Sequence, residues 1–133
     1  RTDARAVNGL DDALRRGELY LKSGADGVFI EAPESLDELA RVGAAFRHVP
    51  QMANMLEAGR TPLIPPDELL RMGFAMVAYP TSLIFRVAHS IEKALADLKA
   101  GQLDLKGEGV DFETFKDIVG FKPWADVEDR FGS

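Results

Sequence analysis

Short apolar runs that end in a polar residue or a proline recur along much of the chain. The clearest is residues 26–33, where valine, phenylalanine and isoleucine lead into the carboxylate of Glu31. Such a run predicts a buried strand of a parallel sheet, covered on both faces. Ligands of parallel α/β sheets bind at the carboxyl ends of the strands, so Glu31 becomes a candidate site residue.

The pattern repeats with a period of roughly 24 residues, which is the size of one βα unit. Strands are predicted at residues 50–55 and 74–80, and residues 1–4 have the character of the end of a strand. Each run closes on a polar residue or a breaker, and besides Glu31 these are Arg1, Asp3, Asn54 and Pro80.

Amphipathic helices are predicted between the strands, over about residues 10–23, 35–46, 65–73 and 81–100. Their apolar positions recur every three or four residues, which is typical of helices that bury one face in a core. Ser35 and Glu38 have the spacing of a capping box, and prolines at positions 65 and 66 suit a first helical turn. The long apolar stripe of the last helix is interpreted as core.

The βα rhythm stops after Gly101. Residues 102–109 form a polar connection, and residues 110–121 predict one further helix. We therefore expect two parts, with four βα units in residues 1–101 and a helical tail in residues 102–133. The tail carries so many aromatic residues that we expect it to dock on another surface: Phe112, Phe115, Phe121, Trp124 and Phe131.

The number of units limits the possible folds. A complete (β/α)8 barrel takes about 250 residues, whereas this chain has 133 and is filled by four strands, four helices and a tail. We therefore predict an α/β fold that is half of a TIM barrel, a prediction favoured by a first strand that starts near its own end. An open doubly wound sheet of the flavodoxin type is the alternative.

Composition narrows the class of protein. With 46% hydrophobic and 29% charged residues the chain is typical of a soluble globular domain. No apolar run approaches the ~20 residues that cross a bilayer, and no signal peptide opens the chain, so a cytoplasmic location and no membrane partner are expected. The absence of cysteine excludes disulfides and a cysteine nucleophile on this segment. A net charge of −6 with mixed signs argues against nucleic acid.

Eight blocks in register resemble the isocitrate lyase and phosphoenolpyruvate mutase family. What they resemble is the carboxyl-terminal half of the family's barrel plus its terminal helices, in the branch of methylisocitrate lyase, dimethylmalate lyase and carboxyphosphonoenolpyruvate mutase. The blocks are Arg1-Thr2-Asp3-Ala4, Gly9-Leu10-Asp11-Asp12-Ala13, Gly24-Ala25-Asp26, Phe29-Ile30-Glu31-Ala32-Pro33, Asn54-Met55, Gly59-Arg60-Thr61-Pro62, Gly73-Phe74 and Tyr79-Pro80.

The resemblance implies a Mg2+-dependent lyase or mutase. Members of the family act on small 2-oxo or 2-hydroxy di- and tricarboxylates, or on related phosphonates, mostly through an enolate intermediate. Their Mg2+ ligands and the loop with the catalytic cysteine of the lyases lie on the amino-terminal half, so no catalytic or metal-binding residue is expected on this segment. Terminal helices are exchanged between subunits in the family, which implies a homo-oligomer, and the other half of the barrel is an implied partner.

Two strand-end residues correspond to family site residues. Arg1 matches a strand-end arginine, whose planar fork suits a bidentate grip on a carboxylate or phosphonate. The alternative is a solvated arginine that pairs with Asp3. Glu31 matches a glutamate that shapes the site, and its alternative role is an exposed carboxylate that caps the next helix.

Three further candidates follow the third predicted strand. Asn54 is an amide that could donate to a substrate carboxylate, or could cap the following loop instead. Thr61 and Pro62 lie in the loop that covers the mouth of the site. Ala58 stands where many family members have a second glycine, which affects only the local geometry of the turn.

Two functions remain open from the sequence. The first is a segment of an enzyme that acts on small carboxylic acids. The second is a non-catalytic open α/β domain that binds a protein through its acidic surface and aromatic tail. Further βα units with clustered aspartates upstream of Arg1 in the parent reading frame would favour the enzyme.

Overall fold

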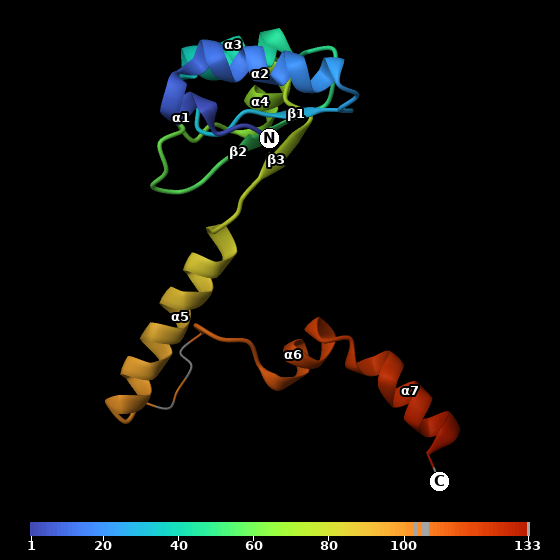
Figure 1. Ribbon diagram of the computed structural model, residues 1–133. Helices are drawn as coiled ribbons and strands as arrows, with labels where there is room; N and C mark the ends of the chain where they lie inside the picture. Colours follow the sequence, from blue (N-terminus) through green and yellow to red (C-terminus); the bar gives the residue numbers. More distant parts are fainter. Residues whose placement is uncertain (103, 105–106, 133) are drawn as a thin grey trace. The chain divides into compact units, whose positions relative to one another are not determined.

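The computed structural model describes residues 1–102, 104 and 107–132 of the chain. It divides into two compact units, Arg1–Ile91 and Glu92–Ser133 (Figure 1). The first unit contains the sheet and the helices around it. The second contains the carboxyl-terminal part of the long helix that follows the sheet, and the two helices of the tail.

The sheet of the first unit is parallel and follows the order of the sequence. Among the described residues its strands are β1 (Val28–Phe29), β2 (Gln51–Asn54) and β3 (Met76–Ala78), in the order β1-β2-β3. Val28 pairs with Gln51, and Met52 with Met76. This order, without the reversal of a flavodoxin-type sheet, is what consecutive units of a barrel produce.

The first predicted strand is reduced to a single bridge. Thr2 pairs in parallel with Ile30, because the Thr2 amide donates to the Phe29 carbonyl and the Glu31 amide donates to the Thr2 carbonyl, both at 3.0 Å. The prediction of a strand through Ala4 is wrong at its end, since Ala4 already begins a short helix. The backbone of α1 is hydrogen-bonded within the helix, so of the predicted strand only Thr2 pairs with the chain at β1.

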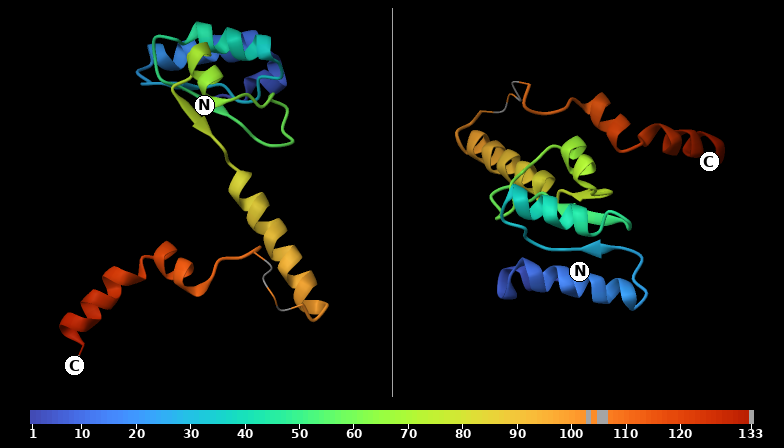
Figure 2. Two further views of the ribbon diagram at one scale, coloured as in Figure 1. Left: turned by 180° about the vertical axis from the view of Figure 1, so that it is seen from behind. Right: turned by 90° about the horizontal axis from the view of Figure 1, so that it is seen from above.

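The helices of the first unit lie beside one another. They are α1 (Ala4–Asn8), α2 (Leu10–Lys22), α3 (Leu36–Ala45) and α4 (Pro66–Met72). α2 and α3 lie side by side over the sheet (Figures 1 and 2), and α3 packs in turn against α4. Three of the predicted helices are confirmed with their ends, whereas α1 had not been predicted.

Two glycines and one buried amide hold these layers together. A side chain at Gly17 would collide with the Phe46 ring, and one at Gly43 would collide with the Met72 carbonyl. The fully buried Gln51 donates from Nε2 to the carbonyls of Gly43 at 2.9 Å and Gly73 at 3.0 Å. The apolar core around them is Ala4, Leu10, Ala13, Val28, Ile30, Leu39, Val42, Phe46, Ala53, Met55, Leu69 and Phe74.

The tail contains a helix that had not been predicted. α5 (Ser82–Lys99) confirms the fourth predicted helix, and α6 (Phe112–Ile118) confirms a helix in the tail. A further helix, α7 (Phe121–Phe131), begins after Gly120, whose left-handed φ of 66° ends the preceding helical run. Among the described residues no helix is both long and apolar enough to cross a membrane.

The apolar stripe of α5 is not core in this chain. Leu83, Ile84, Val87 and Ile91 are exposed, with Leu83 at 77%. The interpretation of this stripe as core is therefore corrected. The physical reason is that the three-stranded sheet described for the first unit is too narrow to close, so within the described residues it does not cover this face of α5.

Ala58 has the left-handed backbone that its place in the turn after β2 requires. Its φ is 59°, a region that costs an L-residue about 1 kcal/mol or more and costs glycine almost nothing. We expect Ala58→Gly to raise the free energy of unfolding by about 0.5–1 kcal/mol in urea denaturation. The helical and exposed Ala44 is the matched control, where Ala44→Gly should lower it by a similar amount. A loss of stability in Ala58→Gly would contradict this account of the turn.

Candidate active site at the carboxyl edge of the sheet

Three of the predicted site residues meet at one edge of the sheet. Arg1 precedes the Thr2 bridge, Glu31 follows Ile30, and Asn54 is the last residue of β2. Parallel neighbouring strands bring these ends together. Asn54 Nδ2 donates to Glu31 Oε1 at 3.3 Å, and Arg1 Nη2 lies 3.2 Å from Glu31 Oε2 in an ion pair that lacks hydrogen-bond alignment.

Arg1 is shared between two carboxylates. Its Nε and Nη2 donate to the two oxygens of Asp3 at 3.2 and 2.8 Å, and its guanidinium lies 5.2 Å from the centre of the Phe29 ring. The hydrogen bonds to Asp3 are the main cause that raises the pKa of Arg1 and lowers the pKa of Asp3. The structure thus contains both the pairing with Asp3 and the approach to Glu31, and the half-exposed guanidinium stays accessible.

Several buried polar atoms at this edge have no hydrogen-bond partner among the described residues. Buried polar groups in proteins nearly always find a partner, so a cluster without one indicates a place for water or a ligand. The set combines acceptors and hydroxyls: Glu31 Oε2, Asn54 Oδ1, Glu57 Oε2, Thr81 Oγ1 and Ser82 Oγ.

Glu57, Thr81 and Ser82 were not predicted from the sequence. The Ser82 hydroxyl lies near enough to lower the pKa of Glu57, although the two side chains are not in hydrogen-bonding geometry. Pro80 had been interpreted only as the breaker that ends a strand. The two hydroxyl residues directly after it were the signal that could have identified this part of the edge.

Thr61 and Pro62 are less well supported. Both are partly buried in the loop between β2 and α4. In the part of the chain that the structure describes, no hydrogen bond or ion pair joins them to Glu31 or Asn54. Their neighbour Arg60 instead places Nη1 3.4 Å from Glu34 Oε1.

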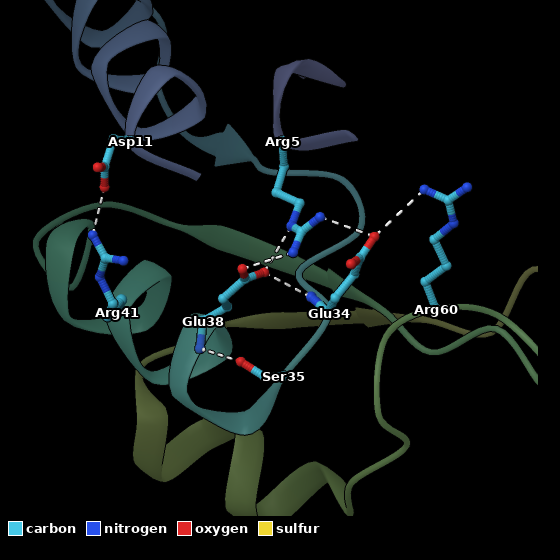
Figure 3. Close-up of polar contacts among 7 residues, drawn as sticks. All are labelled: Arg5, Asp11, Glu34, Ser35, Glu38, Arg41 and Arg60. Carbon is cyan, nitrogen blue, oxygen red and sulfur yellow. Dashed lines mark hydrogen bonds and ion pairs between the residues drawn. The ribbon is translucent and has the colours of Figure 1, made fainter. Parts of the chain in front are cut away.

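A second group of charged residues lies beside the site and had not been predicted (Figure 3). Arg5 of α1 donates from Nε and Nη2 to the two carboxylate oxygens of Glu38 at 2.8 and 2.7 Å. Its Nη1 lies 2.9 Å from Glu34 Oε1. These contacts lower the pKa of Glu38, mainly through the hydrogen bonds from Arg5, and raise the pKa of Arg5.

The capping box at the start of α3 is confirmed in one half and shifted in the other. Ser35 Oγ accepts from the Glu38 amide at 3.1 Å, as predicted. Glu38 Oε2 accepts from the amide of Glu34 at 2.7 Å, one residue earlier than the usual pattern. The shift follows from the two hydrogen bonds that Arg5 donates to Glu38, which hold the Glu38 carboxylate on the side of α1.

The residues present do not form a magnesium site by themselves. Within residues 1–102, 104 and 107–132 no group of three or more histidine, aspartate or glutamate side chains could hold a metal ion. Glu31, the central carboxylate, has Arg1 and Asn54 as neighbours, and a cation beside Glu31 would be repelled by the guanidinium.

The fold and this edge define the class of protein. A parallel α/β sheet with polar residues at its strand ends is typical of proteins that bind small ligands there. A family model described as Phosphoenolpyruvate phosphomutase matches residues 1–99, and the chain belongs to this family. The resemblance seen in the sequence is thereby confirmed.

Similar proteins agree with this assignment. The chain is 35% identical over 133 residues to the petal death protein of Dianthus caryophyllus, covering 98% of this chain and 42% of the relative. It is 36% identical over 138 residues to 2,3-dimethylmalate lyase of Eubacterium barkeri, covering 100% of this chain and 46% of the relative. A solved structure of oxaloacetate acetylhydrolase in complex with the product oxalate matches with a TM-score of 0.89 at 24% identity, covering 100% of this chain and 46% of that chain.

The chain therefore spans less than half the length of these relatives. The relatives of known structure are TIM-barrel enzymes, so the predicted half of a TIM barrel is confirmed and the flavodoxin-type sheet is not. Nothing in the comparisons supports the non-catalytic interaction domain.

Proposed function

We propose that this chain supplies the carboxyl-terminal half of a barrel that cleaves or rearranges small 2-oxo or 2-hydroxy di- or tricarboxylates. The observation that carries the proposal is the mixture of donors and acceptors at the carboxyl edge of the sheet. Arg1 and the hydroxyls of Thr81 and Ser82 can donate to substrate oxygens, whereas Glu31 Oε2 and Asn54 Oδ1 can accept from a hydroxyl. A small hydroxy acid presents both kinds of group.

Each residue has a role that its chemistry allows. The fork of Arg1 holds a substrate carboxylate, which requires that it exchange part of its contact with Asp3 for the ligand. The Asn54 amide orients Glu31 and offers its oxygen to the substrate. Donors that are fixed before the reaction stabilise the negative charge that develops on an enolate oxygen. Thr61 and Pro62 cover the mouth of the site.

The proposal includes Mg2+, held by residues outside this chain. A divalent ion polarises the oxygens of an α-oxo acid and so favours the enolate. The carboxylates that bind it would come from the first four βα units. 2,3-Dimethylmalate lyase, one of the relatives, is by its name a lyase of a small dicarboxylic acid, which is the class of substrate proposed here.

We also propose that the protein is a homo-oligomer in which the tail helices are exchanged between subunits. The apolar side chains of α6 and α7 support the proposal because they are exposed, Phe112 at 73% and Trp124 at 71%. Water-exposed aromatic surface of this extent is typical of protein interfaces.

The first prediction from the proposed function concerns Arg1 in the assembled barrel, meaning this chain together with a segment that supplies the first four βα units. Arg1→Lys should lower kcat/KM by one to two orders of magnitude, about 1.4–2.8 kcal/mol, because a point charge replaces a bidentate fork. Arg15→Lys, on the exposed face of α2, is the matched control and should leave the kinetics unchanged. Equal kinetics for both variants would remove Arg1 from the site.

A second prediction is that the chain alone, from Arg1 to Ser133, shows no turnover. Among the described residues its sheet ends on one side in the Thr2 bridge and on the other in β3, so the barrel is open, and the proposed magnesium ligands belong to the first four βα units. Co-expression with a segment that supplies the first four βα units should give turnover of a 2-methylmalate-like or oxaloacetate-like acid that EDTA abolishes. Mg2+-dependent turnover by the purified chain alone would contradict the proposed half-barrel function.

The third prediction concerns assembly. Removal of residues 110–133 should lower the oligomeric state of the assembled barrel in sedimentation velocity, because the exchanged apolar surface is lost. A control that keeps this surface, Asp117→Asn with Asp129→Asn on the same two helices, should sediment as the unaltered protein does. A truncated protein that keeps its full assembly would show that the tail is not the interface.

A further inference from the structure

The turn that presents Glu31 contains a strained residue. Residues 31–34 connect β1 to α3, and Ala32 within them has a φ of 57°. Ala32 also precedes Pro33, and a residue in that position is normally driven toward extended backbone. Strain of this kind persists only where the surrounding structure fixes it, and such positions are frequent at functional sites. The structure must therefore contain contacts that hold this turn.

Arg5 provides those contacts. Its bidentate fork to Glu38 and its third contact to Glu34 commit all three guanidinium nitrogens (Figure 3). Glu38 returns a hydrogen bond to the Glu34 amide, so Glu34 is held through both its backbone and its side chain. The side chains of Arg5 and Glu38 are 17% and 19% exposed, so solvent screens this network less than a surface ion pair.

The position of Arg5 in the chain links both sides of the turn. Arg5 lies three residues after Thr2, whose carbonyl accepts the amide of Glu31. Glu31 is thus fixed at its amino side by the bridge to Thr2 and at its carboxyl side by a turn that Arg5 holds. The carboxylate that results is the one that contacts Arg1 and Asn54.

We propose that Arg5 is a positioning residue, which acts through the strained turn of residues 31–34 to align the Glu31 carboxylate with Arg1 and Asn54. The kinetic part of this inference rests on the proposed function. Among the described residues, the hydrogen bonds and ion pairs of the Arg5 side chain go to Glu34 and Glu38 and not to Arg1, Glu31 or Asn54.

The same region offers a matched control. Arg41 of α3 also forms an ion pair with another helix, between its Nη2 and Asp11 Oδ1 at 2.6 Å (Figure 3). This pair is exposed, has a single contact and does not reach the turn. Arg41→Met therefore removes an interhelical arginine and leaves the hydrogen bonds of Glu34 and Glu38 in place, since Arg41 acts on Glu38 only through its charge, as the smallest of the causes that lower the pKa of Glu38.

A double-mutant cycle in the assembled barrel tests the kinetic role. Arg5→Met should lower kcat/KM at least tenfold, whereas Arg41→Met should change it less than twofold. In a Glu31→Gln background, Arg5→Met should cost less than a further twofold, because the residue through which it acts is already altered. If the two losses multiply, Arg5 has only a general structural role and the inference is overturned.

A spectroscopic measurement separates this inference from the proposed function. With 13C and 15N labels on this chain in the assembled barrel, the backbone shifts of Ala32 report its left-handed conformation. Arg5→Met should move them toward values of extended backbone, and Arg41→Met should not. Should Arg5→Met fail to fold, Glu34→Gln keeps the fork between Arg5 and Glu38 and should still move the Ala32 shifts.

The outcomes are distinct. An unaltered assembled barrel without turnover overturns the proposed function, and the Ala32 shifts then decide alone whether Arg5 fixes the turn. Ala32 shifts that are the same in the unaltered protein, Arg5→Met and Glu34→Gln overturn the positioning role, whatever the activity.

Discussion

Parallel pairing of consecutive strands is the constraint on which the site depends. Because Thr2, β1, β2 and β3 pair in sequence order and in one direction, every strand ends at the same edge. Arg1, Glu31 and Asn54 are 23 or more residues apart in the sequence, and the pairing alone brings them into contact. A shift of one strand by one residue would turn these side chains to the opposite face. The register is therefore as important to the chemistry as the residues are.

The register is in turn protected by contacts at the other end of the strands. Gln51, the first residue of β2, is almost completely buried, and its amide joins the carbonyls of Gly43 and Gly73 at the ends of two helices. Displacing such a buried amide costs more folding free energy than its hydrogen bonds contribute when they are formed, because the two carbonyls would be left without a donor. Gln51 therefore favours the observed position of β2 relative to α3 and α4 over shifted positions of the strand.

Charge is arranged differently at the two ends of the turn after β1. Toward the site, Glu31 Oε2 forms an ion pair with Arg1 but accepts no hydrogen bond among the described residues. Away from the site, Arg5 binds both carboxylate oxygens of Glu38 and one carboxylate oxygen of Glu34. A hydrogen-bonded network next to a carboxylate oxygen that accepts no hydrogen bond is a physical means of holding that carboxylate still while leaving the oxygen able to accept one. The strain at Ala32 is the cost of that arrangement.

Periodicity in the sequence determined the strands, three of the four helices of the first unit and the candidate residues at the strand ends, because apolar spacing and capping residues act over a few neighbouring positions. The short α1 carries no such signal, since it is little more than one turn. In α7 the apolar residues do recur every three or four positions, at Phe121, Trp124, Val127 and Phe131, but they were interpreted only as an aromatic tail. Tertiary structure alone decided that Arg5 reaches Glu34 and Glu38, and that Glu57 and Ser82 join the edge. These contacts join residues distant in the sequence, and their existence depends on the parallel register and on a turn conformation that local propensity disfavours.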